Sequence, residues 1–508
     1  MGVSTLDVTP KEALVLRRQY TTFLLLCLRW LQRLLLPTPP LQRPTLDLLW
    51  ALDEGHLPLL VRECPVTMQY LHLLGELDWS RFPERARNRA WPGPQPQKRA
   101  PFVAAFLIKL NENKPCMSGL RSFLVNHPGL IWLLGFPLAP SPKSPWGFDP
   151  EKSLPCRQHF SRILRTLQPD QVRFLLAASV ALVGSELDDV TRSDNLSPFG
   201  DEISLDTKHI LAWVRENNPK EFIPHRFDKH NQPKGDPDCK LGCKKRRNLP
   251  THDGTNTTPT QEGMPAGSIE VGDYYWGYAS GVVATKVGDW GEVVLAERTQ
   301  TFDQGDQTFF FPLMHQTQQH LGRRPTFGAF DAAFDAFYVY DYFHDAGGFA
   351  AVPYAGRKDH RKQFDAQGLP LCAAGLAMPL RSTFHKKSLC LVPHQCGRYG
   401  CPLSLDESGR LACPIHHPNW GKGGCSTTLA TSPGARIRHQ LDRHSEQYQR
   451  LYRQRTATER INAQAKELGI ERPRLRNACS IANQNTLIYV LINMRTLHRI
   501  RTRKAQRR

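Results

Sequence analysis

The feature that most constrains the fold of this chain is a change in hydrophobic period near residue 200. Before that point, apolar residues recur at helical spacing, as in FVAAFLIKLNENKPCMSGLRSFLVNHPGLIWLLGF and PDQVRFLLAASVALV. After it, EISLDTKHILAWV, YYWGYASGVVATKV and EVVLAERTQ are short apolar runs typical of strands, and GDWG marks a turn between the last two. A chain that carries both patterns in separate stretches predicts an α/β fold.

The segments that follow alternate in type. DQTFFFPLMHQTQQHLG predicts a helix, PTFGAFDAAF a strand, FYVYDYFHDAG a helix and FAAVPYAG another strand. Three antiparallel strands followed by this alternation predict a mixed sheet with helices on its faces.

Five regions are expected along the chain. Residues 1–99 form an N-terminal helical region, and residues 100–199 form a second helical segment with a DNA-binding role. Residues 200–357 hold the first part of the sheet, interrupted by a loop at 229–268 that is rich in Pro, Gly, Asn and Thr. Residues 358–440 form a cysteine-rich insertion with little core of its own. Residues 441–508 return to the sheet and end in a basic helix.

The charge of the chain indicates a polyanionic partner. Its 508 residues include 66 Lys and Arg against 47 Asp and Glu, a net charge of +19. Nucleic acid is the first partner to expect, because Lys and Arg gain affinity by releasing counterions from phosphates. The runs KKRR at 244–247 and the basic tail at 495–508 fit phosphate contact.

A membrane span is not expected. The longest apolar run, 23–36, is interrupted by Arg29 and Arg33 and is shorter than the ~18 apolar residues that a span needs. An amphipathic helix is the better interpretation, and no signal peptide is visible. The 13 cysteines, an odd number spread over a large chain, indicate a reducing compartment, so we expect a cytoplasmic protein.

The segment 445–468 predicts a long helix with two different faces. At 100° per residue, one arc of about 80° gathers a phenol, two cations, an acid and an amide: Tyr452, Arg455, Glu459, Asn462 and Lys466. The opposite side is apolar. On composition alone, a solvated charged surface is the favoured interpretation of this polar face.

The spacing within that face, Tyr-x2-Arg-x3-Glu-x6-Lys in YRQRTATERINAQAK, resembles the signature of a large group of bacterial insertion-sequence transposases. These are the DDE enzymes with a Tyr-Arg-Glu-Lys motif around their third acid. The resemblance extends to the helical tract beginning RAPFVAAFLIK and to RNACSIANQNTLIYVLINMRTL, so that it covers roughly residues 100–500. It implies a ribonuclease H-like catalytic core, with a location in the bacterial cytoplasm beside the nucleoid.

The resemblance also implies which residues are catalytic. Such a core carries its first Asp on the first strand, its second at the end of the fourth, and its Glu on a later helix. Asp206 lies mid-strand in EISLDTKHI, and Asp331 closes the fourth predicted strand, so both join Glu459. Asp335 is the rival for the second position, but it is expected to open the next helix, where capping is a sufficient role.

The resemblance implies a two-metal reaction on double-stranded DNA. Asp206, Asp331 and Glu459 would bind Mg²⁺ or Mn²⁺, and carboxylates suit these hard ions. One ion activates the attacking water or 3′-hydroxyl and the other stabilises the leaving oxygen. Tyr452 and Lys466 would position terminal DNA phosphates, with Arg455 orienting Glu459. The expected products are cut transposon ends joined to target DNA, made by a homodimer on DNA.

A cysteine cluster is the remaining candidate site. Cys372, Cys401, Cys413 and Cys425 each lie near Gly or Pro, as the thiolates of a structural Zn²⁺ site do. Their spacing is long and irregular compared with a CxxC pair, and buried free thiols are the alternative.

Two other functions stay open on the sequence. One is a non-catalytic DNA-binding protein derived from such a transposase. The other is a ribonuclease H-like nuclease that cuts without joining strands.

Overall fold

The computed structural model describes residue 46 and residues 57–85, 97–194, 196–244, 273–355, 362–387, 391–405 and 413–507. The predicted helix at 23–36, most of the region 1–99, the basic run beyond Lys244 and the second half of the predicted loop 229–268 lie outside these residues. The chain divides into two compact units. One comprises Met1–Ala105 and Arg121–Cys156, and the other Phe106–Leu120 and Arg157–Arg508.

The first unit consists of helices in its described residues. Helices α2 (Leu59–Arg62) and α3 (Pro65–Gly75) pack against α6 (Pro128–Leu134). Gly129 permits this contact, because a Cβ there would lie 2.7 Å from the carbonyl oxygen of Leu60. The short helices η3 (Trp79–Arg81) and α7 (Pro150–Ser153) belong to the same unit. Helices α4 (Ala100–Asn111) and α5 (Met117–Asn126) each lie partly in this unit and partly in the other.

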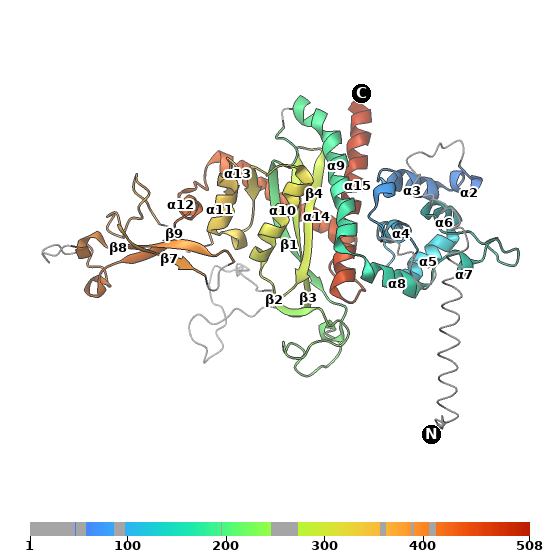
Figure 1. Ribbon diagram of the computed structural model, residues 1–508, viewed down its shortest axis with the longest axis horizontal. Coiled ribbons are helices and arrows are strands. Elements are labelled where there is room, and N and C mark those ends of the chain that lie inside the picture. Colours follow the sequence, from blue (N-terminus) through green and yellow to red (C-terminus); the bar gives the residue numbers. More distant parts are fainter. Residues whose placement is uncertain are drawn as a thin grey trace, which may run out of the picture. The chain divides into compact units, whose positions relative to one another are not determined.

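The second unit is built around a mixed sheet (Figure 1). Its strands are β1 (Glu202–Leu211), β2 (Lys240–Lys244), β3 (Asp273–Val287), β4 (Gly291–Thr301), β5 (Phe327–Ala329) and β6 (Phe349–Ala351). β3 pairs antiparallel with β1, β2 and β4, whereas β5 is parallel to both β1 and β6. The prediction of a mixed α/β sheet is therefore confirmed.

β1 lies at the centre of this sheet. On one side Asp206 pairs with Val282 of β3, and on the other Ser204 pairs with Ala329 of β5. Because side chains alternate along a strand, Ile203 and Leu205 enter the core that includes Phe310 and Phe330, and Asp206 points to the opposite face.

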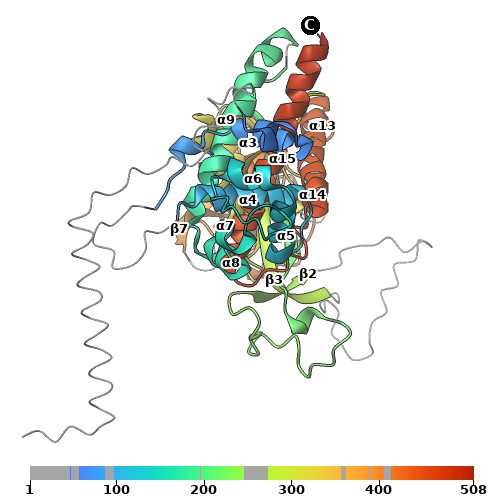
Figure 2. The same ribbon diagram turned by 90° about the vertical axis from the view of Figure 1, so that its right-hand side faces the viewer.

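Helices cover the sheet on both faces. α10 (Phe310–Leu321), preceded by η5 (Asp306–Phe309), packs on β3 and β4, and α11 (Phe337–His344), preceded by η6 (Ala332–Phe334), packs beside β6. α14 (Thr456–Glu467) crosses β1, β3 and β4. α9 (Pro169–Ser193) and α15 (Ala478–Arg507) run side by side along β4, and α8 (Arg157–Thr166) packs on α15 (Figure 1 and Figure 2).

Two asparagines of α15 bind β4: Asn493 pairs with its backbone, and Asn485 with the side-chain hydroxyl of Thr299. The Asn493 amide donates to the Val294 carbonyl (2.9 Å), while its oxygen accepts from the Val294 amide (2.8 Å). The Asn493 amide also donates to Ser179 of α9 (3.0 Å), and the Asn485 amide donates to Thr299 of β4 (2.8 Å). At Val294, Asn493 thus provides the backbone hydrogen bonds that a neighbouring strand would otherwise provide.

A second, smaller sheet lies within residues 358–440. Its antiparallel strands are β7 (Leu380–Lys386), β8 (His394–Gly400) and β9 (Ser426–Ala430), accompanied by η8 (Pro402–Leu405) and η9 (Trp420–Lys422). Three buried residues, Met378, Tyr399 and Leu429, form its core, and all seven residues of β7 are exposed. The sequence did not predict these strands, because their few apolar residues do not alternate.

Two further predictions need correction. The loop expected over 229–268 contains β2, which pairs with β3 although its composition is turn-like. The single helix expected over 445–468 consists of α13 (Glu446–Tyr452), a 3-10 turn η10 (Arg453–Arg455) and α14. The tighter turn changes the angle between Tyr452 and the residues of α14, so the arc of about 80° applies only within α14. The remaining elements are η4 (Arg215–Asn217) and α12 (Gly434–Gln440).

No helix of the described residues is both long enough and apolar enough to cross a bilayer.

The hydrogen bonds of Asn493 to the edge of β4 predict that substitution of Asn493 strongly lowers the stability of the fold. Asn493→Leu leaves the Val294 amide and carbonyl buried without partners, which should lower the free energy of unfolding by about 2–4 kcal/mol. Urea unfolding followed by circular dichroism measures this. Gln506→Leu, at an exposed position of the same helix, is the matched control and should change stability by less than about 0.5 kcal/mol. Equal effects of the two substitutions would contradict the edge-capping role.

Candidate active site

Carboxylates from four separate elements line one pocket of about 1550 Å³. β1 contributes Asp206, the turn after β5 contributes Asp331, α14 contributes Glu459, and η5 contributes Asp306. The structure therefore brings the three predicted acids, which are far apart in the sequence, to the same pocket.

Asp206 is held in a largely buried position on the open face of β1. Its carboxylate accepts hydrogen bonds from the Thr207 amide (2.9 Å) and from the side-chain amide of Asn462 (3.0 Å). Burial raises the pKa of Asp206 to about 6, and the charges of Asp331 and Glu459 act in the same direction. The Thr207 hydrogen bond and Arg455 oppose this rise in pKa. A carboxylate with this environment is stabilised by any added positive charge.

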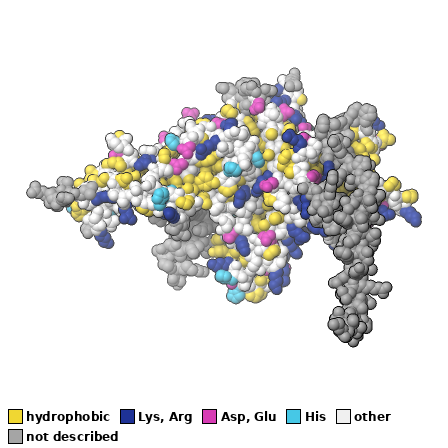
Figure 3. All heavy atoms as spheres, viewed as in Figure 1, with side chains coloured by type: hydrophobic (Ala, Val, Ile, Leu, Met, Phe, Trp, Pro, Cys, Tyr) yellow, Lys and Arg dark blue, Asp and Glu magenta, His cyan; other side chains and the backbone are white. Residues whose placement is uncertain are grey.

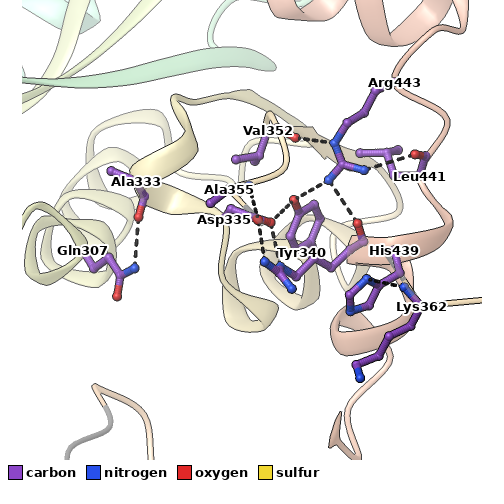
Figure 4. A network of polar contacts seen from close by, with 11 residues as sticks. Gln307, Ala333, Asp335, Tyr340, Val352, Ala355, Lys362, His439, Leu441 and Arg443 are labelled. Carbon is purple, nitrogen blue, oxygen red and sulfur yellow. Dashed lines mark hydrogen bonds and ion pairs between the residues drawn. The ribbon is translucent and has the colours of Figure 1, made fainter. Parts of the chain in front are cut away.

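Asp331 begins the turn η6, where its carboxylate accepts a hydrogen bond from the Ala333 amide (3.0 Å). Burial raises its pKa, and the nearby charge of Asp306 adds to the effect. The Gln307 side chain donates to the Ala333 carbonyl (3.0 Å), which ties the Asp306 turn to the Asp331 turn (Figure 4).

Asp306 is the acid that the sequence analysis missed. It accepts a hydrogen bond from the Thr207 hydroxyl (3.1 Å), next to Asp206, and burial raises its pKa. An acid just before an apolar helix is a common helix-start signal, so the sequence offered no reason to assign it to a site.

Glu459 lies on the exposed face of α14 and forms an ion pair with Arg455 one turn earlier. This contact is the one through which Arg455 would orient Glu459. The Arg455 guanidinium also lies 6.0 Å from the ring centroid of Tyr452. Tyr452 itself is partly buried and stacks on Tyr448 (5.8 Å), so packing accounts for its position.

Lys466 lies at the edge of the same pocket. Its side chain is 65% exposed, and its ammonium lies 3.8 Å from the Glu471 carboxylate. Glu471 forms a shorter ion pair with Lys208 (2.6 Å). Lys466 is therefore weakly held and can reach a ligand in the pocket.

Asp335, the rival of Asp331, has a structural role. Its fully buried carboxylate accepts two hydrogen bonds from Arg438 (2.8 and 2.7 Å), one from the Tyr340 hydroxyl (2.7 Å) and one from the Ala355 amide (2.8 Å) (Figure 4). The expectation that Asp335 caps the following helix was wrong, since Ala336 occupies that position and Asp335 instead joins α11 to α12. All of its lone pairs are used within the fold.

The acid pocket has the right donor chemistry for a hard divalent ion. Asp206, Asp331 and Asp306 present carboxylate oxygens, and burial raises the pKa of all three. Within the described part of the chain, no three His, Cys, Asp or Glu side chains are grouped closely enough to hold a metal ion. Glu459 forms an ion pair with Arg455. That ion pair would have to open before Glu459 could bind a metal ion together with the other two predicted acids.

Three of the four predicted zinc ligands are neighbours. Burial raises the pKa of Cys425 to about 11, and the thiols of Cys401 and Cys372 act in the same direction. The fourth, Cys413, is buried and accepts a hydrogen bond from the His417 amide (3.4 Å).

No protein-family model, curated protein or solved structure matches the chain.

The raised pKa of Asp206 predicts a pH-dependent stability. Above pH 6 the folded protein must hold an ionised, buried Asp206, whereas below about pH 3 the carboxyl is mostly neutral in both the folded and the unfolded state. Asp206→Asn should therefore increase the free energy of unfolding by about 2–3 kcal/mol more at pH 8 than at pH 4.

The measurement is urea unfolding in EDTA-containing buffers across that range. Asp303→Asn, which changes an exposed carboxylate of the same pocket, is the control and should give a small, pH-independent difference. A flat profile for Asp206→Asn would refute the burial argument.

Proposed function

We propose that the protein is a DDE transposase, which cuts DNA at the ends of an insertion sequence and joins them to target DNA. The observation that carries the proposal is that Asp206, Asp331 and Glu459 line one pocket. These are the three residues that the resemblance to DDE transposases predicts from the sequence.

The strand order supports a ribonuclease H-like core. The strand order is β2-β3-β1-β5-β6, and β4 also pairs with β3; β3 is antiparallel and β5 parallel to β1. The first acid lies on the first strand, the second follows the short strand β5, and the third lies on a helix that packs across β1. The cysteine-rich residues 358–440 enter between β6 and the helices that return to the sheet, which supports an insertion.

Asp206, Asp331 and Glu459 would hold Mg²⁺ or Mn²⁺, with Asp306 as a further oxygen donor. The bound ions would activate the attacking oxygen and stabilise the leaving oxygen. The protein's own residues orient this site. Asn462 and Thr207 fix the Asp206 carboxylate, and Arg455 holds Glu459.

The partner in this proposal is double-stranded DNA, bound at transposon ends and at the target by a homodimer in the bacterial cytoplasm. The net charge of +19 supports a polyanionic partner. On the face shown in Figure 3, Lys and Arg side chains gather at the end of the sheet where β2 and β3 lie. Cys372, Cys401 and Cys425 would hold a structural Zn²⁺, with Cys413 as the fourth ligand.

A non-catalytic DNA-binding derivative is the alternative. In such a protein the ion pair with Arg455 would keep Glu459 from binding a metal ion, whereas in the transposase the ion pair orients Glu459 and opens when the ion binds. A nuclease that cuts without joining would use the same pocket, and only the joined product separates it from a transposase.

The first test concerns cleavage. Asp206→Asn should reduce Mg²⁺-dependent cutting of DNA that carries the inverted repeats flanking the coding region by at least about 1000-fold, because an essential ligand is lost. Affinity for that DNA should stay equal or rise, since one negative charge near phosphate is removed. Gel assays of cutting and joining, with Asp303→Asn as the control, measure both. Near-normal cutting by Asp206→Asn would overturn the assignment.

The second test concerns Lys466. As a phosphate contact, Lys466→Ala should lower the slope of log K against log salt by about 0.9 and slow cleavage. As a solvated surface charge, it should alter stability by at most a few tenths of a kcal/mol and leave activity unchanged. Fluorescence anisotropy on end DNA across a salt series distinguishes these outcomes. Lys152→Ala, at a similarly exposed lysine paired with Asp149, is the matched control.

A further inference from the structure

A second pocket, of about 610 Å³, is lined by positively charged side chains. Among the residues that the structure describes, no Asp or Glu lines it, and six cations do: Lys109, Arg157, Arg162, Arg165, Arg474 and Arg476. None of the six forms an ion pair with a described carboxylate, unlike Arg501 and Lys504, which share Glu186. This concentration of unneutralised charge is unfavourable unless an anion binds there.

Lys109 is the least expected member of this pocket. Its side chain is only 5% exposed, and its one hydrogen bond runs to the Gln484 side chain (3.3 Å). Burial lowers its pKa to about 8. A lysine buried without a carboxylate partner carries a desolvation cost that a bound anion would offset.

Helix α8 presents a row of arginines to the pocket. Arg157, Ser161 and Arg165 follow at intervals of four residues, and Arg162 is their neighbour. Eight residues of helix span about 12 Å, and a DNA strand rises about 3.4 Å per nucleotide. The row therefore matches three or four successive nucleotides better than a single phosphate.

The N-terminus of α15 also lines this pocket. Asn477 has a φ of 84° and accepts a hydrogen bond from the Ser480 amide (2.9 Å), so it caps a helix of 30 residues. The positive end of the helix dipole adds to the attraction for an anion.

The basic pocket and the acid pocket are connected by one short segment. Glu471 and Arg472 line the acid pocket, while Arg474 and Arg476 line the basic one. Consecutive residues advance at most about 3.6 Å, so Arg472 and Arg474 lie within about 7 Å. The Leu211 amide, near the end of β1, donates to the Glu471 carbonyl (2.8 Å) and fixes this segment to the sheet.

We propose that the basic pocket binds the phosphate backbone of the DNA strand that leaves the acid pocket, a few nucleotides from the site of cutting. The choice of DNA as the ligand rests on the proposed function. The inference that the basic pocket binds an anion rests only on the charged residues that line this pocket. Trp213, 49% exposed with the Arg474 guanidinium 5.5 Å from its ring centroid, offers a face for a sugar or base.

The test uses the full chain and a fluorescein-labelled duplex of random sequence. Arg162→Gln with Arg165→Gln should lower the salt slope of log K by about 1.8, since each phosphate contact contributes about 0.9. Both arginines are exposed on α8, so the fold should be kept, and the unfolding midpoint checks this. Lys152→Gln with Arg215→Gln removes the same charge from two carboxylate-paired sites and should leave the slope nearly unchanged.

A second readout reports directly on the pocket. Cys116 is exposed there, and the Ser118 hydrogen bond lowers the pKa of its thiol. Alkylation of Cys116 by iodoacetamide, followed by peptide mass spectrometry, should be slowed at least about 5-fold by the duplex at low salt. The Arg162→Gln and Arg165→Gln variant should lose this protection.

Three outcomes are informative. An unchanged salt slope with no protection of Cys116 would overturn the proposal. Protection by inorganic phosphate or ATP but not by duplex would replace it with a small-anion site. Protection by duplex in a protein that never cuts DNA would refute the transposase while leaving the backbone-binding pocket in place.

Discussion

The candidate site depends on the two-sided pairing of β1. Antiparallel pairing with β3 and parallel pairing with β5 bury this strand at the centre of the sheet, so that alternate residues face opposite sides. Ile203 and Leu205 enter the core, and Asp206 points away from it toward α14. The parallel β5 ends beside β1, which explains why Asp331, two residues beyond it, reaches the same pocket.

A sheet with a buried carboxylate at its centre needs strong support at its edges. α15 supplies it, because Asn493 pairs with both backbone groups of Val294 and Asn485 bonds to Thr299. A helix carrying these amides would normally be assigned a solvated face. Here they are buried because the strand edge offers partners that water would otherwise provide. The same helix places its capped N-terminus at the basic pocket, so it serves both the sheet and the further proposal.

Much of the fold was predictable because its elements are long and strongly patterned. β1, β3, β4, α10 and α15 follow apolar periods that local physics alone explains. The failures share a different cause. β2 and β7 have few apolar residues and exist because a neighbouring strand offers backbone hydrogen bonds. The 3-10 turn at Arg453–Arg455 lies inside a helical pattern, and no Pro or Gly in this stretch of the sequence indicates a break in the helix.

The sequence by itself determined which acids were candidates, through the Tyr-Arg-Glu-Lys spacing within residues 445–468 and the apolar setting of Asp206. Only the tertiary structure decided how each acid is held. It binds Asp335 to Arg438 and removes it from the candidates, and it adds Asp306 through the Thr207 hydroxyl. The reason is physical. Spacing encodes which residues share a helix face, whereas the desolvation of a carboxylate and the partner that compensates it depend on segments brought together by folding.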